Sequence, residues 1–280
     1  MVNVVYGTIE SSHMRMILIA AAEMGLLNTP AFELRKLDWM ILYGPDDQFD
    51  CKASPFKRFP WFEDTGNGVK LYESRAIIKY LAARTKSPLL PDLSEPAAMA
   101  KFDSACSIEL GDFAPYTNRF LWEVFYGPMF ARKPPTPDVV HMCQDALTNS
   151  LRGYERILRD QNYLAGDDLT LVDLFHIPAG YLATQLGAIP ILQDSVPRFP
   201  IPGPADVPSR SEGSIPLPDQ GKEGDGTWPL PHVKAWWDKL LQRESVKLVN
   251  KMFEDRMIEW AEAQKNDETK TNYDYTANKL

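Results

Sequence analysis

Cysteine is scarce in this chain of 280 residues, which contains three cysteines: Cys51, Cys106 and Cys143. They are widely spaced, and no two of them form a Cys-x-x-Cys pair. This number and spacing exclude both a disulfide framework and a zinc cluster built on cysteine pairs. The four histidines are scattered as well, so the sequence predicts no metal site.

An excess of positive charge is also missing, because 38 acidic residues outnumber 30 basic ones and the net charge is −8. Binding to nucleic acid needs clustered lysine and arginine, so we expect no nucleic-acid partner.

No apolar run reaches the roughly 20 residues that span a bilayer. The longest early run, Met14 to Leu27, contains Arg15 and Glu23 and does not resemble a signal peptide. We therefore expect no membrane partner and a cytoplasmic location.

Recognisable phosphate-binding loops, nucleophile elbows and paired-histidine metal helices are absent too. The composition is that of an ordinary globular protein, with 44% hydrophobic and 24% charged residues. The length allows one large domain or two modest ones.

The first 85 residues have the pattern of a compact α/β unit. A helix with an apolar face follows Ser11 and Ser12 and ends at Gly25, and a second helix starts at Glu73. Gly66-Asn67-Gly68 is typical of a hairpin turn. Strands are predicted at residues 2–6, 32–37, 59–63 and 69–72.

The remainder of the chain is predicted to be helical. Residues 86–96 contain three prolines and are expected to form a linker, and 97–265 form an all-α domain. Thr170 to Asp173 resembles a capping box. Helical patterns cover residues 97–126, 138–160, 170–186 and 232–263.

Two segments of the second domain are expected to lack regular structure. Residues 194–231 contain nine prolines and five glycines, which indicates an extended insertion. This insertion is either a surface loop or a loop that folds against the body and shapes a pocket. The polar tail, 266–280, is expected to fray.

Several residues of the first domain could form a binding site. Ser11 and Ser12 lie where a strand turns into a helix, and Glu73-Ser74 opens a helix directly after a strand. Unpaired N–H groups at a helix N-terminus stabilise anions. Each feature also has a simpler interpretation, because serine and glutamate are common helix caps. Pro60 interrupts an aromatic stretch, and a cis Phe59–Pro60 bond would expose the Phe59 backbone to a bound peptide.

Taken together, these motifs resemble the cytosolic glutathione transferase family, in its phi-like or fungal form. The likeness covers about residues 1–193 and 231–255. The stretches that carry it are Leu71-Tyr72-Glu73-Ser74-Arg75-Ala76-Ile77, Ser54-Pro55-Phe56-Lys57-Arg58-Phe59-Pro60, Tyr163 to Asp173, and His232-Val233-Lys234-Ala235-Trp236-Trp237. The resemblance implies a thioredoxin-like N-terminal domain, an all-helical C-terminal domain and glutathione bound between them.

The resemblance also implies roles for individual residues. Ser11 would donate a hydrogen bond that favours the glutathione thiolate, and Ser12 is a second candidate for this role. The backbone of Phe59, beside Pro60, would pair with the cysteinyl part of glutathione. The γ-glutamyl end would contact Glu73 and Ser74.

The glycyl end of glutathione is where this sequence departs from the family pattern. The loop that often supplies basic residues there reads Pro45-Asp46-Asp47. Either Arg58 or Lys52 would then pair with the glycyl carboxylate, or glutathione would bind more weakly. Ser54 and Lys57 also replace the residues that are usual in the loop before the proline.

The acceptor pocket is expected on the first long helix of the second domain. The candidates are Phe113, Tyr116 and Phe120, although an aromatic stripe of this kind is equally typical of a helical core. Such a pocket would favour small apolar electrophiles.

The resemblance allows three functions. The first is a transferase that conjugates glutathione to a small apolar electrophile. The second is a glutathione-dependent cis–trans isomerase of a conjugated olefin in a biosynthetic pathway for secondary metabolites. The third is a non-catalytic binding protein that keeps the fold. Family likeness also suggests a homodimer, with Arg75 near the subunit interface.

Overall fold

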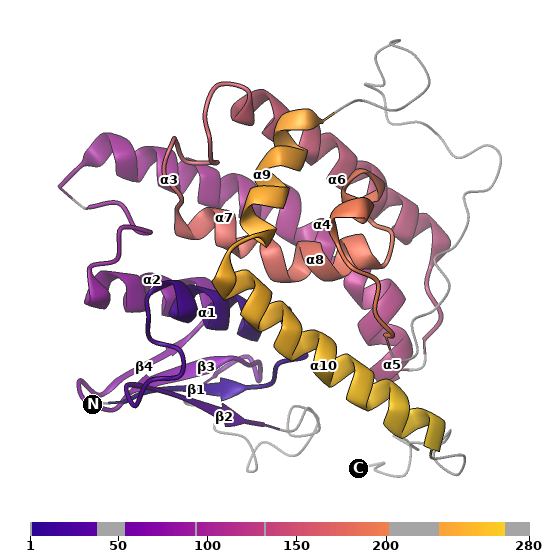
Figure 1. The fold of residues 1–280 in the computed structure, drawn as a ribbon, viewed down its shortest axis with the longest axis horizontal. Helices are drawn as coiled ribbons and strands as arrows, with labels where there is room; N and C mark the ends of the chain where they lie inside the picture. Colours follow the sequence, from indigo (N-terminus) through magenta and orange to yellow (C-terminus); the bar gives the residue numbers. More distant parts are fainter. Residues whose placement is uncertain (1, 38–53, 93, 132, 202–229, 267–280) are drawn as a thin grey trace.

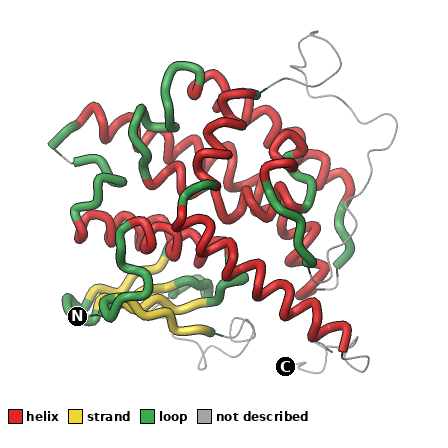
Figure 2. Tube along the Cα trace, in the orientation of Figure 1, coloured by secondary structure: helices red, strands yellow, loops and turns green. Residues whose placement is uncertain are grey.

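The computed structural model describes residues 2–37, 54–92, 94–131, 133–201 and 230–266. Within these residues, the strands lie together at one end of the molecule and the remaining regular structure is helical (Figure 2). The N-terminal unit consists of β1 (Asn3–Gly7), α1 (Ser12–Glu23), β2 (Phe32–Lys36), β3 (Trp61–Asp64), β4 (Val69–Tyr72) and α2 (Ser74–Thr85). The predicted strands and helices of this unit are all present, with ends shifted by no more than two residues.

The four strands form one mixed sheet in the order β2-β1-β3-β4. β1 is parallel to β2, and β3 is antiparallel to both of its neighbours. β1 and β4 therefore end at the same edge of the sheet, and β3 begins there. This topology brings together three segments that are far apart in the sequence: the β1–α1 loop, the residues before β3, and the β4–α2 turn.

Helix α1 is the central helix of the molecule. Nearly every residue from Ser12 to Ala21 is buried, because α2, α7, α8 and α10 pack around the helix and its Met14 lies against Gly7 of β1. An apolar sequence such as Ile17-Leu18-Ile19-Ala20-Ala21 is typical of a helix that is covered on all sides. Figure 1 shows α1 and α2 lying between the sheet and the helical unit.

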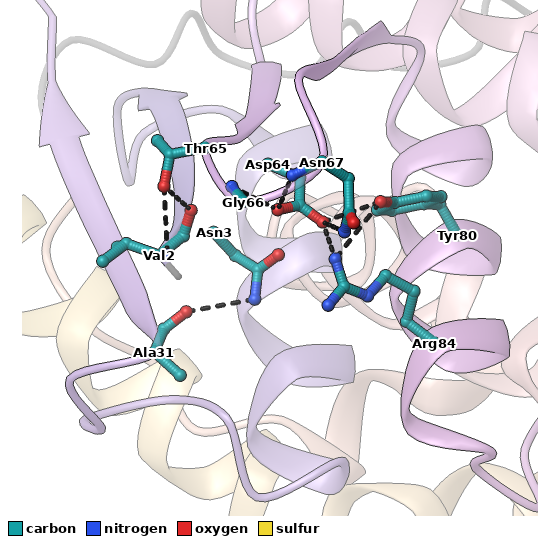
Figure 3. Close-up of polar contacts among 9 residues, drawn as sticks. All are labelled: Val2, Asn3, Ala31, Asp64, Thr65, Gly66, Asn67, Tyr80 and Arg84. Carbon is teal, nitrogen blue, oxygen red and sulfur yellow. Dashed lines mark hydrogen bonds and ion pairs between the residues drawn. The ribbon is translucent and has the colours of Figure 1, made fainter.

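Asp64, the last residue of β3, connects the β3–β4 hairpin to α2. Its carboxylate is buried and accepts hydrogen bonds from the N–H groups of Gly66 (2.9 Å) and Asn67 (3.2 Å) and from the hydroxyl of Tyr80 (2.7 Å). Arg84 forms an ion pair with the same carboxylate (Figure 3). Because Tyr80 and Arg84 belong to α2, these contacts fasten the β3–β4 turn to the second half of that helix.

The C-terminal unit is entirely helical within the described residues. Its elements are α3 (Pro96–Ile108), η3 (Glu109–Phe113), α4 (Ala114–Leu121), η4 (Trp122–Tyr126), α5 (Gly127–Ala131), α6 (Pro137–Leu158), α7 (Leu171–Phe175), α8 (Ile177–Gln185), η5 (Pro190–Ser195), α9 (Pro231–Leu241) and α10 (Glu244–Asn266). None of the described helices combines the length and the apolar character that crossing a bilayer requires.

Three helices that the sequence pattern predicts as continuous are interrupted. The helix at 97–126 contains two π-helical turns, η3 and η4. The helix at 170–186 is divided at His176, because Pro178 has no N–H to continue the hydrogen-bond ladder. The helix at 232–263 is two helices, α9 and α10, which meet at Gln242 and Arg243.

The linker and the insertion are only partly described. α2 ends at Thr85 and α3 begins at Pro96, so the connection between the units spans 86–95. Residues 194 and 195 belong to η5, and 196–201 form neither helix nor strand. The rest of the predicted insertion, up to 229, and the tail from 267 lie outside the described residues.

Candidate functional site

Three segments converge at the edge of the sheet where β1 and β4 end. They are the loop Thr8–Ser12, the dipeptide Phe59-Pro60 and the turn Glu73-Ser74. The first two lie close together, because a Cβ atom added to Gly7 would lie 3.6 Å from the Cα atom of Pro60. The third is tied to α1 by the Ser74 hydroxyl, which lies 3.8 Å from the sulfur of Met16. The structure therefore gathers the serine, proline and Glu-Ser motifs into one site.

Ser11 is the N-cap of α1, and its Oγ accepts a hydrogen bond from the N–H of Met14 (3.4 Å). A hydroxyl has one proton and two lone pairs, so this capping contact leaves the proton of Ser11 available to donate. Ser12 differs, because its hydroxyl and backbone are hydrogen-bonding partners of Tyr126. Both serines are buried, but Ser11 is the one whose described contact uses only an acceptor position.

The Phe59–Pro60 peptide bond is cis. The loop before it is held by Ser54, whose Oγ donates to the carbonyl of Arg58 (2.6 Å) and accepts from the N–H of the same residue (3.1 Å). Ser54 therefore fixes the backbone leading into Pro60 although it differs from the usual residue. Arg58 itself is exposed at the rim of the site.

Glu73 is the N-cap residue of α2, but its side chain makes no capping hydrogen bond. It is exposed, and its φ angle is 70°, which is unusual for a residue other than glycine. Strained backbone of this kind is concentrated at functional sites. The adjacent Ser74 is buried, and the partner of its hydroxyl is a sulfur, which is a weak acceptor. Both side chains are therefore suited to contact a ligand.

His13, which the sequence gave no reason to select, lies beside this site on the first turn of α1. Burial and the nearby Arg75 lower its pKa to about 4, and Arg58 acts in the same direction. His13 is therefore neutral at physiological pH. Arg75 forms a bidentate ion pair with the buried Glu109, with N–O distances of 2.7 and 2.6 Å.

The other wall of the site comes from the helical unit, through residues that sequence reasoning also missed. Tyr126 of η4 donates its hydroxyl to the backbone carbonyl of Glu10 (3.1 Å). Arg256 of α10 pairs with the Glu10 carboxylate at 2.6 Å. These contacts cross 116 and 246 residues of sequence, so no local pattern could reveal them.

The structure places the predicted pocket residues elsewhere. Phe120 is fully buried, and Phe113 is 2% exposed and packs on the ring of His176 at 4.6 Å. They belong to the core of the helical unit. Tyr116 lines a groove between η3–α4 and α6. Tyr126 replaces them as the aromatic residue that lies against the serine loop.

Among the described residues, no cluster of histidine, cysteine, aspartate or glutamate side chains is arranged to hold a metal ion. Lys52 and the Pro45-Asp46-Asp47 segment lie outside the described residues. Arg58 is the candidate for the glycyl carboxylate that the structure does describe.

The chain matches two protein-family models. The model described as "Glutathione S-transferase, N-terminal domain" matches residues 6–88, and the one described as "Glutathione S-transferase, C-terminal domain" matches residues 118–199. The chain is 36% identical over 185 residues to glutathione S-transferase PM239X14 of Arabidopsis thaliana, which covers 65% of this chain and 67% of that protein. It is also 36% identical over 129 residues to glutathione S-transferase hmp2 of Hypomyces subiculosus, which covers 45% of this chain and 60% of that protein.

Solved structures show the same fold. Glutathione transferase F7 from Populus trichocarpa has a TM-score of 0.68 at 23% identity, covering 89% of this chain and 98% of its own. A glutathione S-transferase I bound with lactoylglutathione has a TM-score of 0.66 at 25% identity, covering 89% of this chain and 98% of its own. These matches confirm the thioredoxin-like domain and the helical domain that the sequence motifs predicted.

Proposed function

Because this chain belongs to the glutathione S-transferase family, we propose that it activates the thiol of glutathione for attack on a small apolar electrophile. Glutathione is the co-substrate of this enzyme, and when bound it supplies the thiol that reacts as a thiolate. The observation that carries the proposal is the convergence of Ser11, cis-Pro60 and Glu73-Ser74 at one edge of the sheet. We also propose that the enzyme is cytoplasmic, because the family that its motifs resemble is cytosolic.

Ser11 is the residue that we propose stabilises the thiolate. A free thiol has a pKa of about 8.5, and lowering it by about two units requires about 2.7 kcal/mol of preferential stabilisation. One hydrogen bond to a charged acceptor contributes roughly 1.5–3 kcal/mol, and the helix N-terminus adds to it. The available proton of Ser11 at the start of α1 can meet this requirement.

The remaining residues of the site hold the two ends of the tripeptide. Glu73, whose carboxylate makes no capping bond, would face the γ-glutamyl ammonium group. Ser74 would donate to the γ-glutamyl carboxylate at the positive end of the α2 dipole. Arg58 at the rim would pair with the glycyl carboxylate. His13 is neutral and therefore adds no charge between these ends.

The proposal is tested by calorimetric titration of glutathione into the unmodified chain and into the Glu73→Ala variant. Loss of a charge-assisted contact is expected to weaken binding about 10- to 100-fold. Glu95→Ala is the matched control, because Glu95 is also an exposed N-cap residue without a capping bond. Binding that is absent up to several millimolar (roughly −3 kcal/mol), or equal in the two variants, would contradict the proposed site.

Mass analysis of the products distinguishes conjugation from isomerisation. A stable glutathione adduct with an apolar electrophile is the result expected for the transferase. A conjugated olefin that returns with changed geometry and unchanged mass, with glutathione recovered, would instead identify the isomerase.

We also propose that the enzyme is a homodimer. Phe56 is 67% exposed and lies edge-on to the exposed Tyr72, with ring centroids 6.4 Å apart. The groove between η3–α4 and α6, about 470 Å³ in volume, has an apolar lining that includes Ile108, Tyr116 and Ile157. In a two-fold dimer, the exposed aromatic side chain of each protomer can occupy the apolar groove of its partner.

Replacing Phe56 by serine is expected to weaken dimerisation about 100-fold or more, because buried aromatic anchors dominate interface energies and the change occurs twice. Sedimentation velocity over a dilution series measures the effect. Trp122→Ser is the control, since Trp122 is also exposed and apolar but lies away from the groove lining. Equal dimerisation of both variants would exclude Phe56 as the anchor.

A further inference from the structure

The loop that carries Ser11 contains a buried carboxylate. Glu10, the residue directly before Ser11, is 3% exposed. A buried carboxylate is costly unless it is paired and hydrogen-bonded. The groups that face Glu10 therefore determine both the position of the loop and the charge beside the reactive serine.

Glu10 is held from two sides by the helical unit. The Nε of Arg256 on α10 donates to its Oε1 at 2.6 Å, and the Tyr126 hydroxyl of η4 donates to its backbone carbonyl at 3.1 Å. Within the loop, the hydroxyl of Thr8 donates to Oε2 of Glu10. Residues from both units thus meet at Glu10.

Arg15 is the second cation near Glu10, but its guanidinium packs against an aromatic ring of α10 and is not bonded to Glu10. Its guanidinium is fully buried on α1 and lies 3.7 Å from the ring centroid of Phe253 on α10. Burial lowers the pKa of Arg15 to about 10, and Tyr126, Tyr181 and Glu10 partly oppose this effect. Among the described residues, no hydrogen bond or ion pair joins its nitrogens to the Glu10 carboxylate. Arg256 is therefore the cation that is hydrogen-bonded to Glu10 in the described structure.

We propose that Arg256 is a positioning residue for catalysis: its ion pair with Glu10 fixes the Thr8–Ser12 loop and neutralises the carboxylate beside Ser11. This inference rests on the proposed role of Ser11 in stabilising a thiolate. An unpaired Glu10 would repel a second negative charge nearby and so raise the pKa of the bound thiol. Arg256 acts through Glu10 and Ser11 and needs no contact with substrate.

The chain contains a matched control at the opposite end of α1. Arg243, directly before α10, donates to both oxygens of Glu23, at the end of α1, with distances of 2.6 Å each. Both ion pairs connect the α9–α10 segment to the N-terminal unit, both carboxylates are largely buried, and both arginine side chains are 33% exposed. Only the Glu10–Arg256 pair adjoins the site.

The test compares Arg256→Gln, Arg256→Lys and Arg243→Gln in the full chain. Both glutamine variants are expected to lower the melting temperature by several degrees. Hydrogen exchange of the free protein is expected to quicken in the Thr8–Met14 segment for Arg256→Gln only. The pKa of the bound thiol, measured by ultraviolet titration, is expected to rise by about one unit in that variant, from about 6.5 to about 7.5, with kcat about threefold lower at pH 7 because the thiolate fraction falls by that factor. Glutathione affinity is expected to fall no more than about fivefold, because Glu10 does not hold the tripeptide ends and the change in thiol pKa alone accounts for about threefold at pH 7.

The outcomes separate this inference from the proposed function. Partial recovery of the thiol pKa and of loop protection in Arg256→Lys would support the ion pair as their cause. An Arg256→Gln variant that matches Arg243→Gln in exchange, thiol pKa and kcat would overturn the inference while leaving the proposed function intact. Failure of the unmodified chain to bind glutathione would instead overturn the proposed function, and unchanged loop exchange would then also overturn the inference.

Discussion

Asp173→Ala is expected to lower the free energy of unfolding by about 5 kcal/mol, which approaches the whole stability of many domains. The Asp173 carboxylate is fully buried and accepts hydrogen bonds from the N–H of Leu164, the indole N–H of Trp236, and the N–H and hydroxyl of Thr170, all at 3.0–3.1 Å. Removing it leaves several buried donors without an acceptor, and each costs about 1–3 kcal/mol. Urea denaturation followed by tryptophan fluorescence measures the loss.

Asp167→Ala is the matched control for this prediction. Asp167 belongs to the same turn and accepts two hydrogen bonds from Asn162, but these bonds are exposed to solvent. Its removal is expected to cost less than about 1 kcal/mol. Similar losses in the two variants would show that the capping box contributes no more than a surface turn.

The second large effect concerns turnover. Ser11→Ala is expected to lower kcat by up to about 100-fold, since it removes one hydrogen bond to a charged sulfur. Ser12→Ala is expected to change kcat less than about threefold, because the Ser12 hydroxyl already interacts with Tyr126. Steady-state kinetics with saturating glutathione measures both.

Because Ser11 also caps α1, the effect of losing the helix cap must be distinguished from the effect of losing the hydrogen bond to the thiolate. Ser11→Gly lacks the hydroxyl too, but glycine at an N-cap costs only a few tenths of a kcal/mol. Equal kcat values for the alanine and glycine variants, despite different melting temperatures, would assign the loss to catalysis. A large loss in Ser12→Ala with normal turnover in Ser11→Ala would transfer the role to Ser12.

The sheet and the Glu-Ser turn could be predicted because their signals are local. Alternating apolar residues and the Gly66-Asn67-Gly68 turn mark the hairpin, and Tyr72 to Ser74 mark the strand-to-helix transition. The division of the helix at 170–186 had a local signal too, in Pro178.

The wall of the site that the helical unit provides could not be predicted in the same way. An aromatic stripe such as Phe113 to Phe120 has the same spacing whether it faces a core or a cleft. Each π-helical turn adds a residue and rotates the following side chains by about 100° relative to an unbroken α-helix. The η4 turn lies in the stretch that presents Tyr126, so a regular helical repeat cannot place that residue.

The central place of α1 has a consequence for how the polypeptide is made. Synthesis delivers this helix first and α10 near the end, yet α8 and α10 cover apolar surface that α1 cannot hide against the sheet and α2 alone. Until α8 and α10 have been synthesised, the nascent chain therefore carries a helix whose apolar surface is only partly buried. The two units are separate in architecture, but the N-terminal unit produced alone would expose the apolar surface of α1 that α8 and α10 cover, and is expected to aggregate.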